Sequence, residues 1–268
     1  MRDFITWNIS KGSRKLARAD AFIVSFPKSG RTWVRVFYYA YLSALAGREF
    51  SWNGEGFPGR PKVVFTHDRW QHRLLPGWWN FIRGRHLIPP RLRQERKIVL
   101  MVRDPRDVTV SLYFHLSKRA HVFKWAPQPL SEMLRDPKFG VAHVVELMNT
   151  WLAEWDGKAN FLLIRYEDCR ADAAREFRRL LEFVGLGPVD ERALAQALDY
   201  SSFEKMQARE AEGKLKEDEL SAGNRQDKDS FKTRKGKVGG FREHFNAADL
   251  EFAAREVARL DPRFNYKA

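Results

Sequence analysis

The chain has 268 residues, 44% of them hydrophobic, and contains 20 Phe, 9 Trp and 7 Tyr. These apolar side chains are enough for a well-packed interior, which excludes wholesale disorder, and the length favours one domain over two. The formal net charge of +14 points to an anionic partner, and the single cysteine, Cys169, excludes an internal disulfide and any cysteine-rich metal site.

The N-terminal residues lack the features of a secretory signal. The longest apolar stretch, Val36 to Ala46, is shorter than the ~20 residues that cross a bilayer. We therefore expect a cytoplasmic protein without a membrane-spanning helix, and the lone cysteine agrees with a reducing compartment. We expect one domain over residues 1–268, with its core over residues 20–265.

Four short runs of branched or aromatic residues predict buried strands. They are Ala21 to Phe26, Val63 to Thr66, Lys97 to Val102, and Asn160 to Arg165. Helical patterns follow Gly30 and Asp107, and the segment Ala171 to Val184 is amphipathic. Strands that alternate with helices predict an α/β fold, in which helices flank a central parallel sheet on both faces.

A first polar motif lies where the strand Ala21 to Phe26 ends and a helix begins; it reads Pro27-Lys28-Ser29-Gly30-Arg31-Thr32-Trp33. A helix N-terminus presents free N–H groups and a positive dipole end, so a tight turn at Gly30 lets a phosphate or sulfate approach closely. The lysine precedes the glycine, unlike in the Walker pattern, which disfavours a magnesium-dependent ATPase or kinase. For this segment alone, an ordinary turn with a solvated lysine fits equally well.

A second polar motif, Arg103-Asp104-Pro105-Arg106-Asp107, comes directly after the strand Lys97 to Val102. The guanidinium fork of Arg103 and the hydroxyl of Ser111, which lies one to two turns into the next helix, can clamp a second phosphate. Two anion sites predict a ligand with two separated anionic groups.

A third segment, from Gln207 to Gly240, consists mostly of charged, glycine and small polar residues, and an aromatic and helical pattern resumes at Phe241. This composition predicts a mobile basic loop excursion over residues 207–240 rather than a linker between domains.

The two polar motifs resemble the 5′-phosphosulfate and 3′-phosphate motifs of the cytosolic-type sulfotransferase family, which uses 3′-phosphoadenosine 5′-phosphosulfate (PAPS). Arg234-Lys235-Gly236 resembles the C-terminal loop with which the family closes over the 3′-phosphate. Three motifs in the family's order imply a sulfotransferase with a P-loop-like strand-turn-helix for the phosphosulfate. They also imply PAPS as co-substrate, 3′-phosphoadenosine 5′-phosphate (PAP) as product, and no metal.

Shorter matches extend this resemblance. Val64-Phe65-Thr66-His67 resembles the strand that carries the family's catalytic base, and Tyr166-Glu167-Asp168 and Ser201-Ser202-Phe203 resemble its adenine-side segments. The resemblance implies that His67 is the general base, that Lys28 stabilises the leaving phosphate, and that Ser29 tunes this lysine. The donor-binding residues that it implies are Lys28, Ser29, Gly30, Arg31, Thr32, Trp33, Arg103, Ser111, Tyr166, Ser201, Phe203, Arg234, Lys235 and Gly236.

Some positions depart from the family pattern. Arg31 stands where the family often has threonine, which would strengthen anion binding, and Phe65 stands where many members have lysine, which removes a charge near the base. Gly240-Phe241 replaces the familiar Asp-Trp pair. The family's dimer motif survives only as spacing between Arg242 and Glu251, so the oligomeric state stays open.

Charge and aromatic residues also suggest functions without catalysis. Arginines interleaved with tryptophans between Arg69 and Arg96 fit a basic nucleic-acid-binding protein, but no helix-turn-helix, zinc or RNA-recognition signature appears, so we expect no specific nucleic acid. Trp78, Trp79 and Phe81, among basic neighbours, fit a peripheral membrane contact, which can coexist with an enzyme. Specificity lies in variable loops, so a small-molecule, glycan or lipid acceptor stays open, as does a hydroxyl or an amine as the group that is modified.

Overall fold

A four-stranded parallel sheet forms the centre of the computed structural model, which describes residues 16–52, 57–68, 88–118, 128–213, 224 and 226–267. Its strands are β1 (Ala21–Ser25), β2 (Val63–Thr66), β3 (Lys97–Val102) and β4 (Phe161–Arg165). They lie in the order β2-β1-β3-β4, and every neighbouring pair is parallel. All four predicted strands are confirmed, as is the α/β fold with one central parallel sheet.

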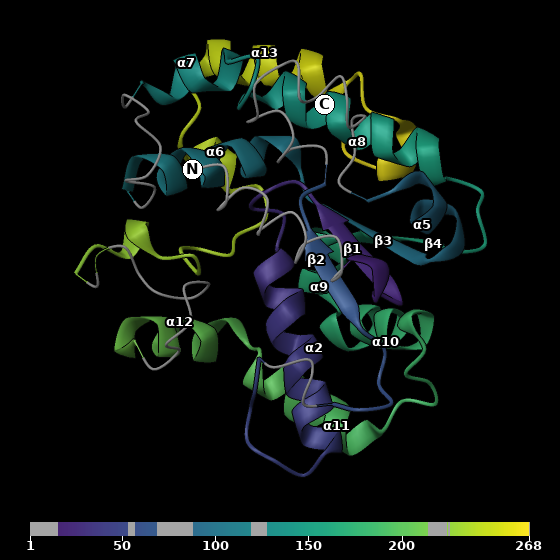
Figure 1. The fold of residues 1–268 in the computed structure, drawn as a ribbon. Coiled ribbons are helices and arrows are strands. Elements are labelled where there is room, and N and C mark those ends of the chain that lie inside the picture. Colours follow the sequence, from purple (N-terminus) through teal and green to yellow (C-terminus); the bar gives the residue numbers. More distant parts are fainter. Residues whose placement is uncertain are drawn as a thin grey trace, which may run out of the picture.

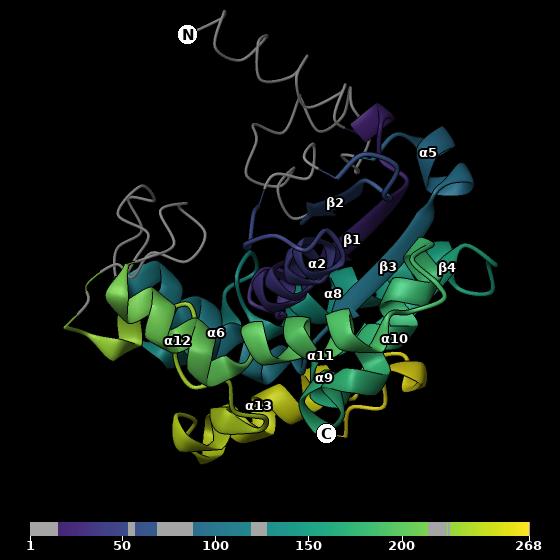
Figure 2. The ribbon, with the colours of Figure 1, turned by 90° about the horizontal axis from the view of Figure 1, so that it is seen from below.

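Helices cover both faces of the sheet, as Figures 1 and 2 show. One layer contains α2 (Arg31–Leu45), α10 (Ala173–Val184) and α11 (Glu191–Tyr200). The other contains α6 (Pro105–Lys118), α8 (Val141–Trp155) and α13 (Ala247–Val257). The remaining elements are α5 (Pro90–Glu95), α7 (Leu130–Arg135), α9 (Tyr166–Ala171), α12 (Phe203–Glu212) and the 3₁₀ turns η2 (Lys228–Ser230), η3 (Gly240–Glu243) and η4 (Pro262–Phe264).

The strands are apolar on both sides because each side faces its own layer of helices. Side chains alternate along a strand, so Phe22 and Val24 join the core cluster of α6, α8 and α13. Ile23 and Val99 join the cluster of α2, α10 and α11. This arrangement explains why the strands appear in the sequence as continuous apolar runs.

The strand order determines where the two polar motifs lie. The chain passes from β1 to β2 on one side of the sheet and then returns to place β3 on the other side of β1. The connections that leave the carboxyl ends of β1 and β3 therefore diverge, and ligands of open α/β sheets bind in the crevice at such a point. The first motif follows β1 and the second follows β3, so the fold brings both to one crevice.

The segment 207–240 differs from the predicted excursion at both ends. Residues 207–212 belong to α12, and Phe231 is buried. The buried carboxylate of Glu210 accepts hydrogen bonds from the backbone N–H groups of Lys232 (2.6 Å) and Thr233 (2.9 Å). A buried acceptor that satisfies two backbone donors holds the chain in place, and residues 232–237 and Gly240 line the crevice.

Within the described residues, no helix is both long and apolar enough to cross a membrane. The predicted membrane-contact residues Trp78, Trp79 and Phe81 lie outside the described residues.

Candidate active site

A cavity of about 350 Å³ opens at the crevice between β1 and β3. The predicted site residues that line it are Lys28, Gly30, Arg31, Thr32, Trp33, His67, Arg103, Ser111, Tyr166, Phe203, Arg234, Lys235 and Gly236. Two other predicted residues, Ser29 and Ser201, are buried and do not line it. Ser201 is the C-terminal cap of α11, and its hydroxyl lies 3.5 Å from the Leu198 carbonyl. The fold thus brings residues from six separate segments of the chain to one cavity.

The turn after β1 is tight at Gly30, which has a φ of 98° and caps α2. A Cβ atom at this position would lie 2.7 Å from Met101 Cε and 2.7 Å from Tyr166 Cδ2, so only glycine fits without a shift of these neighbours. Lys28, also with a positive φ of 73°, lines the cavity just before the start of α2. The cavity therefore meets the N-terminus of a 15-residue helix and an ammonium group, the combination that favours an anion.

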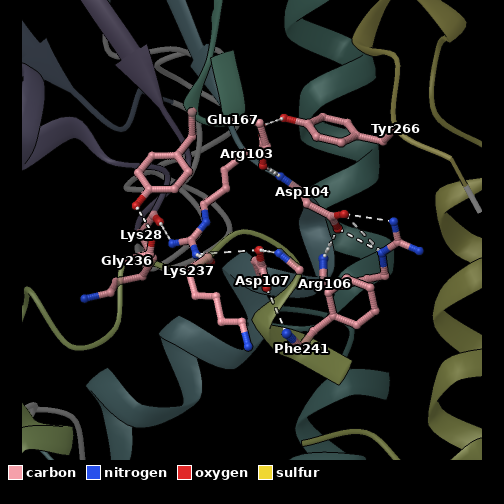
Figure 3. A network of polar contacts seen from close by, with 12 residues as sticks. Lys28, Arg103, Asp104, Arg106, Asp107, Glu167, Gly236, Lys237, Phe241 and Tyr266 are labelled. Atoms are coloured by element: carbon pink, nitrogen blue, oxygen red, sulfur yellow. Dashed lines mark hydrogen bonds and ion pairs between the residues drawn. The ribbon is translucent and has the colours of Figure 1, made fainter. Parts of the chain in front are cut away.

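The guanidinium group of Arg103 joins the turn after β1 to the C-terminal segment, as Figure 3 shows. Arg103 Nη2 donates to the Lys237 carbonyl at 3.0 Å, and Nη1 lies 3.4 Å from the Lys28 carbonyl. The same group lies 4.4 Å above the centre of the Tyr166 ring. These contacts fix the direction of the Arg103 charge at the cavity wall.

The turn that follows Arg103 is supported from behind by residues near the C-terminus (Figure 3). The Asp104 carboxylate binds the Arg106 guanidinium, which also donates to the Lys267 carbonyl at 2.7 Å. Glu167 accepts from the Asp104 backbone N–H at 2.9 Å and from the Tyr266 hydroxyl at 2.7 Å. Burial raises the pKa of Glu167, and these two donors partly offset that effect. The second motif thus sits on a buried network rather than on a free loop.

Aromatic rings line another part of the cavity wall. The Trp33 ring meets the Tyr166 ring edge to face, with 5.9 Å between centroids, and the Arg170 guanidinium lies 5.8 Å from the Phe203 ring and 6.0 Å from Trp33. Gly236, with a φ of 58°, lies against Phe203, and its carbonyl accepts from the Tyr166 hydroxyl at 3.1 Å. An apolar slot edged by cations suits a flat aromatic ligand with negative groups.

His67 lies just beyond the end of β2, where its Nδ1 atom is 2.9 Å from the Ser25 carbonyl. A carbonyl oxygen can only accept, so Nδ1 carries the proton and Nε2 is left as the basic atom. Burial of the ring and then the charge of Arg31 lower the His67 pKa to about 3. The imidazole is therefore neutral at physiological pH in the free protein.

The cavity is strongly cationic. Among the residues that the structure describes, eight lysine and arginine side chains and one carboxylate line it: Lys28, Arg31, Arg103, Arg170, Lys232, Arg234, Lys235 and Lys237, and Asp107. Burial lowers the pKa of Arg234, whose guanidinium lies 3.4 Å from the Asp229 carboxylate and 4.0 Å from the centre of the Phe114 ring.

Sequence reasoning missed four of these charged residues, Asp107, Arg170, Lys232 and Lys237. Arg170 stands four residues after Tyr166 in α9, so helical spacing alone would have placed both on one face. Lys232 lies in the segment that was expected to be solvated. The described residues contain no group of three or more His, Cys, Asp or Glu side chains that could hold a metal ion.

Comparisons with known proteins identify the family and the fold. The family model of the sulfotransferase domain matches residues 82–259. Human sulfotransferase 2B1 is 28% identical over 282 residues, which cover 96% of this chain and 71% of the human protein. The structure of a mouse sulfotransferase complexed with PAP has a TM-score of 0.62, with 20% identity over 89% of this chain and 82% of the mouse chain. That of retinol dehydratase in complex with androsterone and the inactive cofactor PAP has a TM-score of 0.60, with 19% identity over 89% of this chain and 79% of that chain.

Proposed function

The chain belongs to the sulfotransferase domain family, and from that premise we propose that it transfers a sulfuryl group from PAPS to a hydroxyl or amine of an acceptor, releasing PAP. One observation carries the proposal: a single cationic cavity holds the turn after β1, Arg103 and the loop 234–236, with His67 at its wall. Two separated anion-binding turns match a donor with a phosphosulfate at one end and a 3′-phosphate at the other.

The cavity residues fit this donor. Arg103, Ser111 and Arg234 would bind the 3′-phosphate, for which guanidinium forks are well suited. The slot formed by Trp33, Tyr166 and Phe203 offers apolar faces for the adenine ring. The 3′-phosphate contacts would distinguish PAPS from ATP, whose phosphates are all on the 5′ side.

Bound PAPS would supply an activated sulfuryl group. The ammonium group of Lys28 would stabilise negative charge that develops on the leaving phosphate, with the N–H groups at the start of α2. The Nε2 atom of His67 would take the acceptor's proton, because Nδ1 is engaged with the Ser25 carbonyl. Ser29, which is buried within the turn, would tune Lys28.

For the acceptor we propose a small apolar alcohol. The retinol dehydratase structure holds androsterone together with PAP, and the cavity lining here includes the apolar side chains of Leu112, Leu116 and Met206. Location in the cytoplasm is proposed on the buried free thiol of Cys169, which suits a reducing compartment.

The donor proposal is tested by calorimetric titration with PAP, AMP and ATP. We expect tight binding of PAP alone, and Arg103→Ala should weaken PAP binding more than AMP binding, whereas Lys28→Ala should weaken both. Wild-type protein that binds PAP no more tightly than AMP would refute a PAPS donor site.

Labelled PAPS with a panel of steroid and phenolic alcohols then tests the acceptor class. Sedimentation with anionic vesicles tests the membrane contact proposed for Trp78, Trp79 and Phe81.

A further inference from the structure

The one carboxylate among the described residues of the cavity wall belongs to Asp107, in the first turn of α6. Its side chain is only 2% exposed. A negative charge in a cavity that must receive an anionic donor repels that donor. Burial also raises the pKa of Asp107, an effect that Arg103 and two backbone N–H groups partly offset. Repulsion of the donor and the cost of burial both disfavour a carboxylate here, so its contacts should explain its presence.

The two oxygens of Asp107 hold a distant part of the chain. Oδ2 accepts from the Gly239 backbone N–H at 2.8 Å, and Oδ1 accepts from that of Phe241 at 2.9 Å (Figure 3). These donors stand 132 and 134 residues further along the chain and mark the start of η3. With both oxygens engaged, the carboxylate fixes the position and the orientation of this turn relative to α6. The segment immediately before the turn is the loop of Arg234, Lys235 and Gly236.

The same carboxylate also orients Arg103. Oδ2 lies 3.6 Å from Arg103 Nη2, and this Nη2 donates to the Lys237 carbonyl. Asp107 is therefore in contact with the candidate phosphate ligand Arg103 directly, and through Gly239 and Phe241 with the loop that supplies Arg234. Replacement of the carboxylate by an amide would leave one of the two N–H groups facing an NH₂ group and would remove the charge beside Arg103.

We infer that Asp107 is the positioning residue for recognition of the 3′-phosphate: it aligns Arg103 with the loop 234–237 so that both can bind that group at once. This inference rests on the proposed donor. It does not place Asp107 in contact with the nucleotide, and it assigns no part in the chemical step to the carboxylate.

The test is whether one substitution strengthens or weakens PAP binding. If Asp107 were only a negative charge in the wall, Asp107→Asn would remove a repulsion and strengthen PAP binding. If it positions the 3′-phosphate ligands, the same change weakens PAP binding, and we expect a loss of about tenfold or more with AMP binding changed less than about threefold. The quantity to measure by calorimetry is the ratio of the PAP and AMP dissociation constants.

Asp104→Asn is the matched control, because Asp104 is a buried carboxylate of the same turn that binds Arg106 and does not line the cavity. It should lower stability without changing the PAP to AMP ratio. Wild-type protein with no preference for PAP would overturn the donor proposal and this inference together. A wild-type preference that survives in Asp107→Asn would overturn this inference alone.

Hydrogen exchange on the wild-type protein keeps the inference testable if the Asp107→Asn variant does not fold. The Gly239 and Phe241 amides should be protected in the free protein, and PAP should slow their exchange several-fold more than AMP does. Equal protection by the two nucleotides would show that these hydrogen bonds are not linked to the 3′-phosphate.

Discussion

Substitution of Gly236 tests how closely the loop 234–236 packs against Phe203. The φ of Gly236 is 58°, and a Cβ atom there would lie 2.6 Å from Phe203 Cε2 and 2.8 Å from Cδ2. In Gly236→Ala, the left-handed backbone costs roughly 1–2 kcal/mol. Relief of the overlap costs a further 1–3 kcal/mol or so, because a ring cannot bend away as a flexible side chain can.

If the loop moves outward to relieve this overlap, it must return against the strain of about 1–3 kcal/mol whenever PAP binds. At 1.4 kcal/mol for each factor of ten, PAP affinity should fall between about 5-fold and 150-fold. Calorimetry measures the affinity, and thermal unfolding measures the strain. Gly157→Ala is the control: its φ is 73° and nothing lies within 4 Å of its added Cβ, so it should lose stability without losing PAP affinity. A Gly236→Ala variant that binds PAP within twofold of wild type would refute this account of the loop.

Further predictions concern the base, two serines and the loop anchor. NMR titration of His67 should show a neutral ring at pH 5 in the free protein, because its pKa is lowered to about 3. The free energy of unfolding should fall as the pH drops from 6.5 towards that value. A titration midpoint of the ring near 6.5 would contradict the buried, cation-flanked histidine. Ser201→Ala should leave PAP affinity unchanged, whereas Ser111→Ala should weaken it several-fold, and calorimetry on both checks whether the cavity lining identifies the ligands. Glu210→Gln should cost about 1–3 kcal/mol in urea unfolding, because an amide cannot accept all the donors of Lys232 and Thr233, and an unchanged midpoint would show that this anchor contributes little.

The sheet and the location of the site could be predicted because their signals are local. The runs Val63–Thr66 and Lys97–Val102 are continuous and apolar, as strands buried on both faces must be. Each polar motif directly follows a strand, and the carboxyl ends of parallel strands meet at one edge of a sheet. These features required no knowledge of distant contacts.

The parts that could not be predicted depend on long-range contacts or on the direction of a side chain. Nothing near Asp107 in the sequence indicates that its partners are Gly239 and Phe241, because that pairing exists only after the chain has folded. The charged composition after Gln207 looks solvated until Glu210 is seen to hold the backbone beyond it. Ser201 shows the converse: resemblance placed its segment near the site but could not say that its hydroxyl faces away.

The distance along the chain between Asp107 and its partners also has a consequence for biosynthesis. Strands β1 to β4 are all translated before residue 166, whereas the turn that completes the cavity emerges after residue 238. A nascent chain that already contains all four strands therefore still lacks residues of the cavity wall. Nucleotide in the surrounding solution can stabilise only chains in which this last turn has docked, so it acts late, as a selective stabiliser of finished molecules rather than as a template for folding.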